Sequence, residues 1–141
     1  MVSLNDLAFP ITLFGQHLKS VIKHFSEYLD EHGDVYFYDK LSLVYHKHGI
    51  EFIFNNKMYV ETIHVHVTTK HSFICDTDVI KTLLSLRSKL GQPHKVKEPS
   101  LLPVLGFTPK TETYLIHDAK IVFTYDRDPN ILSIITVFKD D

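Results

Sequence analysis

Apolar side chains recur every three or four residues between Gly15 and Asp30, which is the spacing of one face of an α-helix. Charged side chains fall largely on the opposite face, and Gly33 follows as a stop signal. The pattern therefore predicts a first helix over 15–30 with a single buried face. Its apolar positions are Leu18, Val21, Ile22, Phe25, Tyr28 and Leu29.

Short segments in which apolar and polar residues alternate follow this helix, and alternation is typical of a half-buried strand. The run Asn55-Asn56-Lys57 separates the last two segments, and Asn tolerates the left-handed backbone of tight turns. We therefore expect an antiparallel meander. Its strands cover residues 35–38, 41–45, 50–54 and 59–67.

The same order of patterns returns later in the chain. An apolar stripe predicts a second helix over 78–90, ended by Gly91 and Pro93. Four prolines between 92 and 110 predict a loop, or a segment that follows the edge of a sheet. Alternating segments resume after this stretch. They cover residues 111–117, 120–125 and 131–138.

The two halves of the chain resemble one another, roughly 12–67 and 78–138. The hairpin over 50–65 is similar to the hairpin over 121–136. One copy would leave the apolar face of its sheet in water, whereas two copies can cover each other. The sequence therefore predicts an α+β fold, a single domain over 1–141 built from two tandem related halves, each a helix followed by an antiparallel β meander.

The composition indicates a folded hydrophobic core and argues against some classes of partner. The 141 residues are 44% hydrophobic and include ten Phe and seven Tyr. The net charge is −2 and only two residues are Arg, which argues against a nucleic-acid partner. The sequence has no signal-peptide or membrane-span pattern, so we expect a cytoplasmic protein that does not bind a membrane. The one cysteine, Cys75, cannot form an internal disulfide or a zinc finger.

Sequence motifs for catalysis are missing. The chain has neither a glycine-rich phosphate loop nor a Gly-x-Ser-x-Gly nucleophile elbow, and no nucleophile stands beside a candidate base. We therefore expect a protein that is not an enzyme and needs no cofactor.

Histidines form two pairs with strand spacing, His46 with His48 and His64 with His66. Residues at i and i+2 of a strand point the same way, so each pair could chelate one metal ion. Four imidazoles would converge if the two strands were neighbours. The alternative is that His64 and His66 line the polar face of a half-buried sheet.

Carboxylates gather where the first predicted helix ends, and tyrosines follow them directly. Acids at a helix C-terminus oppose the helix dipole, so they need a reason to be there. One interpretation is a solvated face; the other is a docking patch for a basic partner, with tyrosine anchors inside a charged rim. The candidate partner-binding residues are Glu27, Asp30, Glu31, Asp34, Tyr36 and Tyr38.

Two segments carry a family resemblance: 86–93 (Leu-Arg-Ser-Lys-Leu-Gly-Gln-Pro), and 114–138 with its Tyr-Asp-x-Asp turn. The plan of a helix, such a turn and a β meander, repeated once, resembles small immunity proteins encoded beside secreted bacterial toxins of the contact-dependent inhibition or pyocin type. The resemblance implies cytoplasmic binding and neutralisation of a cognate toxin, often a nuclease.

Two alternatives remain at this stage. One is a metal- or small-molecule-binding domain that uses the histidine strands. The other is a homodimeric structural or adaptor domain that pairs through an edge strand.

Overall fold

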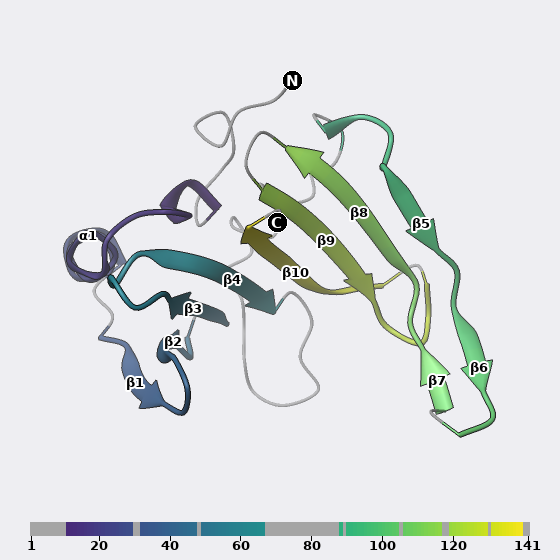
Figure 1. Cartoon of the computed structure of the whole chain (residues 1–141), viewed down its shortest axis with the longest axis horizontal. Coiled ribbons are helices and arrows are strands. Elements are labelled where there is room, and N and C mark those ends of the chain that lie inside the picture. The colour runs from purple at the N-terminus through teal and green to yellow at the C-terminus, as the bar shows by residue number, and fades with distance from the viewer. Residues whose placement is uncertain are drawn as a thin grey trace.

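A long antiparallel sheet organises the chain (Figure 1). The computed structural model describes residues 11–29, 32–47, 49–66, 88, 90–104, 106–116, 119–129 and 131–139. One half of the sheet contains β1 (Asp34–Phe37), β2 (Leu41–Tyr45), β3 (Ile50–Phe54) and β4 (Val60–His66). It continues through β10 (Leu132–Lys139), β9 (Ala119–Tyr125), β8 (Thr111–Ile116) and β5 (Lys95–Lys97). A separate hairpin of β6 (Ser100–Leu102) and β7 (Gly106–Thr108) extends beyond it.

The first helical region is shorter and less regular than its pattern predicts. It comprises η2 (Ile11–Leu13), the helix α1 (Leu18–His24) and a π-helical turn, η3 (Phe25–Leu29). Val21 and Phe25 are buried as expected, but Ile22 is exposed. The apolar stripe is therefore narrower than predicted within α1 itself, and the widened π-helical turn departs from the 3.6-residue period after His24.

Backbone hydrogen bonds hold the start of α1 against the sheet. The amide of Gly15 donates to the carbonyl of Val60 at 3.1 Å, and the amide of Leu18 donates to that of Met58 at 2.9 Å. The side chain of Asn55 accepts from the amide of Tyr59 at 3.0 Å, as expected for an Asn turn. The left-handed residue of that turn is Met58, however, with φ 69°.

One face of the sheet carries the core. Alternate side chains of all the central strands are buried on it, as the alternating pattern predicts. Phe25 joins the helical region to this face by stacking on Tyr45, with ring centroids 3.6 Å apart. The strand residues buried there include Leu43, Tyr45, Ile50, Phe52, Ile63, Val65, Tyr114, Ile121, Phe123, Ile135 and Val137.

The two halves meet at an antiparallel seam between β4 and β10. His64 lies opposite Thr136 in this seam, and the strands β3 and β9 flank it on either side. Both flanking hairpins have a register shift at the same place, between Ile53 and Phe54 and between Leu132 and Ile134. The paired residues of one half can be superposed on those of the other, a correspondence that we call the two-fold match. It relates the halves by an approximate two-fold axis through the His64–Thr136 pair.

The strand ladders of the two halves therefore correspond to one another. In the two-fold match Ile63 corresponds to Ile135, whereas the hairpins 50–65 and 121–136, aligned by sequence, differ from this by one residue. The reason is that the connection from β9 to β10 is one residue longer than the connection from β3 to β4. The described residues do not show the predicted helix in each half. The second predicted helix lies outside them except for Ser88 and Leu90, which are helical, and Leu90 packs against the core.

One further strand prediction needs correction, and another is confirmed. The register shift turns Val60 toward the core, although the alternation places it on the face of His64. The proline-rich stretch over 92–110 follows a sheet edge, as one of the two predictions has it, since β5 pairs with β8. It also forms the β6–β7 hairpin, where Arg127 lies 5.0 Å from the ring centroid of Phe107.

One buried carboxylate interrupts the apolar face. Glu112 is buried on β8, and the hydroxyl of Tyr125 donates a hydrogen bond to its Oε1. In the two-fold match Leu43 of the first half corresponds to Glu112, and Phe54 corresponds to Tyr125. Both Leu43 and Phe54 are buried. The second half thus has a polar pair where the first half has an apolar one.

We expect Tyr125→Phe to lower the free energy of unfolding by about 1–3 kcal/mol, because it removes a donor from a buried carboxylate. The double change Glu112→Leu with Tyr125→Phe copies the first half and should recover most of that loss. Urea unfolding of the three proteins measures both effects. A double variant less stable than Tyr125→Phe alone would contradict this account of the pair.

Candidate functional site

The edge strand β1 exposes a continuous run of large apolar side chains. The exposed fractions are 62% for Val35, 41% for Tyr36, 68% for Phe37 and 84% for Tyr38. No strand in the described part of the chain pairs with the outer edge of β1. Adjacent exposed hydrophobic residues on a free edge are unusual in a stable monomer, which makes β1 the candidate site of this fold.

The exposure of β1 follows from where the core ends. Val35 pairs with Leu43, and Phe37 pairs with Leu41, so both side chains point to the core side of the sheet. Leu43 is buried and Leu41 packs against the core, yet Val35 and Phe37 remain exposed. The apolar face of the sheet therefore continues one strand beyond the part that the core covers.

The opposite face of β1 carries polar contacts. The Nε2 atom of His46 lies 3.0 Å from Oδ2 of Asp34 and 3.5 Å from the hydroxyl oxygen of Tyr36. The rings of Tyr36 and His46 meet edge to face, with centroids 6.5 Å apart. All three side chains are exposed, so this cluster orients Tyr36 at the surface and encloses no reaction site.

The structure brings together part of the predicted partner-binding set. Asp34 and Tyr36 share a face of β1, and Tyr38 is exposed in the turn after it. Glu27 is exposed on the turn η3, while Asp30 and Glu31 lie outside the described residues. Sequence reasoning missed Val35 and Phe37. The signal was the run 35–38 (Val-Tyr-Phe-Tyr), which lacks the alternation with polar residues that a half-buried strand shows.

The histidines do not converge as the metal hypothesis requires. His46 follows β2 and His64 lies on β4, and β3 separates these two strands. No group of three or more metal-binding side chains occurs within the described residues, and His48 is not among them. His64 and His66 instead line the outer face of the sheet, half-buried, as the alternative interpretation predicts.

His64 has the most distinctive environment of these histidines. Its Nδ1 lies 3.2 Å from Oγ1 of Thr136 across the seam. Burial lowers the pKa of His64 below its ordinary value of 6.5; the neighbouring Glu51 carboxylate raises this pKa and His66 lowers it further. The net direction is downward, so folding favours the neutral imidazole.

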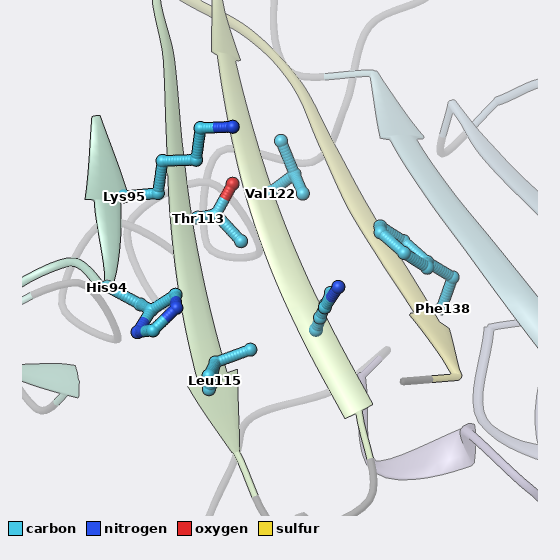
Figure 2. A pocket seen from close by; sticks show the side chains of 7 residues that line it. His94, Lys95, Thr113, Leu115, Val122 and Phe138 are labelled. Carbon is cyan, nitrogen blue, oxygen red and sulfur yellow. The ribbon is translucent and has the colours of Figure 1, made fainter. Parts of the chain in front are cut away.

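A second surface feature lies on the outer face of the other half of the sheet (Figure 2). It is an open groove of about 380 Å³, bordered by His94 and Lys95 at β5. Figure 2 shows the side chain of Lys95 extending over β8 toward Val122. The remaining lining residues are Thr113, Leu115, Lys120, Val122 and Phe138.

Comparison with known proteins leaves the family open. No family model and no curated protein matches the sequence. The fold is similar to the crystal structure of a DUF4309 family protein from Bacillus subtilis, with a TM-score of 0.45 and 13% identity over 88% of this chain and 78% of that one. No described helix has the length and apolar character needed to cross a membrane.

The lowered pKa of His64 predicts how stability depends on pH. The unfolded chain, with a histidine pKa near 6.5, binds the proton more tightly than the folded one. The free energy of unfolding should therefore be fully present above pH 6.5 and fall as the pH drops toward the lower folded pKa. His24, whose pKa burial also lowers, adds to the same trend.

Urea unfolding across this pH range should show a smaller loss for His64→Gln than for the unchanged protein. NMR titration of the His64 ring gives a matched pair of tests: Glu51→Gln should lower its pKa and His66→Gln should raise it. An identical pH dependence in His64→Gln would show that this histidine does not carry the effect.

Proposed function

We propose that this chain is an immunity-type inhibitor that binds a cognate secreted bacterial toxin in the cytoplasm and neutralises it by protein–protein contact. The observation that carries the proposal is the exposed apolar run of β1. The resemblance of the sequence to immunity proteins indicates that the partner is a secreted bacterial toxin.

The contrast between the two edges of the sheet supports a role for β1 in binding. β5, at the opposite edge, has the sequence Lys95-Val96-Lys97, with prolines at 93 and 99 on either side. Lysines and prolines on an edge strand prevent unwanted pairing with other chains. β1 has neither within its bounds, so its edge is left open to a partner strand.

Charge around β1 fits a basic partner. Asp34 and Asp39 are exposed at the two ends of the apolar run, and Glu27 is exposed on the turn η3. An apolar centre with a charged rim is the usual anatomy of a protein interface, and opposite charge on the partner speeds association. Toxin nucleases need basic surfaces to hold nucleic acid, so their surfaces suit this rim.

The direct test uses the toxin domain encoded beside the gene for this chain. The purified full chain should form a stoichiometric complex with that domain and abolish its activity in a turnover assay. A toxin domain that keeps full activity with the chain in excess would overturn the proposal.

Replacement of the apolar side chains should separate binding from folding. We expect Phe37→Ala to weaken the complex roughly 30-fold, the effect of losing a contact worth about 2 kcal/mol. Its thermal stability should change little, since Phe37 is exposed. Calorimetric titration measures the dissociation constant of each variant.

Leu101→Ala is the matched control, because Leu101 is 79% exposed on the β6–β7 hairpin at the other end of the molecule. It should leave the dissociation constant unchanged. Equal effects of the two substitutions would remove β1 as the binding surface.

The open edge of β1 also favours a second function, a homodimer in which two β1 strands pair. Light scattering distinguishes the two. A dimer that Phe37→Ala converts to a monomer would support self-pairing. A protein that is monomeric at every concentration would exclude the homodimer and favour toxin binding by β1.

A further inference from the structure

We propose that β1 takes up an extended segment of its partner as a further strand of the eight-stranded sheet, and that this segment alternates apolar with basic side chains. This binding mode rests on the proposed function, since it uses the same surface, and it adds how that surface holds the partner. Strand addition binds mainly through backbone hydrogen bonds, so the backbone of β1 decides whether it is possible.

A backbone hydrogen bond in the turn after β1 shows which amides of this strand point outward. The amide of Tyr38 donates to the carbonyl of Lys40 at 3.4 Å, in line with the ladder between β1 and β2. Tyr38 therefore directs its backbone groups toward β2. Inward and outward groups alternate along an antiparallel strand, so the amides and carbonyls of Val35 and Phe37 point to the open edge.

A second hydrogen bond, between β4 and the start of β3, gives the same assignment. The amide of His66 donates to the carbonyl of Gly49 at 2.8 Å, so Gly49 faces β4. Followed through the paired residues of β3 and β2, the alternation again directs Tyr36 to β2 and leaves residues 35 and 37 facing outward. Outward donors and acceptors on a sheet edge are a template for a further strand.

The side chains on the core side of β1 select one face of the added strand. Val35 and Phe37 lie on this side, and a residue opposite them on a partner strand would share their face. An apolar residue there would cover these two exposed side chains and continue the buried face by one more strand. The segment therefore needs apolar residues at every second position.

Charge selects the other face of the added strand. Asp34 keeps 65% of its side chain exposed although His46 contacts it, and Asp39 is exposed in the turn beyond β1. Lys40, which follows Asp39, is paired with Glu61 on β4. A lysine or arginine of the partner on this face would meet the two aspartates. Basic residues therefore fit the positions between the apolar ones.

The test is an NMR titration of the full chain with the peptide Thr-Lys-Val-Arg-Val-Lys-Thr, blocked at both ends. The dissociation constant should be on the order of 1 mM or lower. At saturation, hydrogen exchange should slow at the amides of Val35 and Phe37 and change less at Tyr36, which is already bonded to β2. The same peptide with Glu at each basic position should bind at least tenfold more weakly.

Val35→Pro tests the backbone separately from the side chain. It removes an outward amide without breaking the ladder to β2, and proline is tolerated on the open side of an edge strand. It should weaken peptide binding at least tenfold, because it leaves a carbonyl of the peptide without its donor.

Val35→Thr is the matched control, because it keeps both the amide and the branched shape. It should change the dissociation constant by no more than about threefold, as expected for an exposed position. Unchanged amide shifts in β2, β3 and β4 of both free variants show that they are folded. The exchange pattern of the unchanged chain decides the question without any variant.

Four results would each overturn strand addition: no saturable binding, equal binding of the two peptides, equal binding by Val35→Pro, or shifts away from β1. A free chain of twice the expected mass, with the amides of Val35 and Phe37 already protected, would overturn it as well and assign the edge to a second copy.

Failure of the proposed function gives a different result. If the toxin domain is bound and inhibited but Val35→Pro has no effect on either ligand, strand addition fails and the function stands. If the peptide binds to β1 as described but the toxin domain keeps its activity, the function fails and the strand site stands.

Discussion

The pairing of β4 with β10 is the interaction on which the rest of this molecule depends. Ile63 and Val65 face Val137 and Ile135 across this seam, and all four side chains are fully buried. Without the seam, each half would expose a central strand edge and the border of its apolar face. The seam joins two small sheets into one that is wide enough to bury a common core.

Sharing a core leaves the two halves free to differ at their surfaces. The two-fold match places Asp34 with Lys95 and Tyr36 with Lys97, so corresponding edge positions have opposite charge or different character. On the outer face of the sheet it also relates Glu51 to Val122 and Gly49 to Lys120. The backbone is repeated, whereas the surface chemistry differs in each copy. The two halves of one fold therefore present surfaces of different chemistry.

Sequence periodicity located most strands because their burial alternates with the backbone. It could not show the order of the strands, and hence that β1 is an edge or that β3 separates His46 from His64. Local irregularities also escaped it. The register shift beside Phe54 turns Val60 toward the core, and the π-helical turn after His24 interrupts the regular helix; neither changes the composition of the segment. Glu112 was overlooked because a buried carboxylate is rare and its partner Tyr125 is brought to it by folding.

Native-state hydrogen exchange tests the central place of the seam most directly. The hydrogen-bonded amides of β4 and β10 should share the slowest exchange in the protein and open with the full free energy of unfolding, while those of β1 should open locally at lower cost. Two separate opening energies, one for each half of the sheet, would contradict the account, because they would mean that the halves are stable without each other.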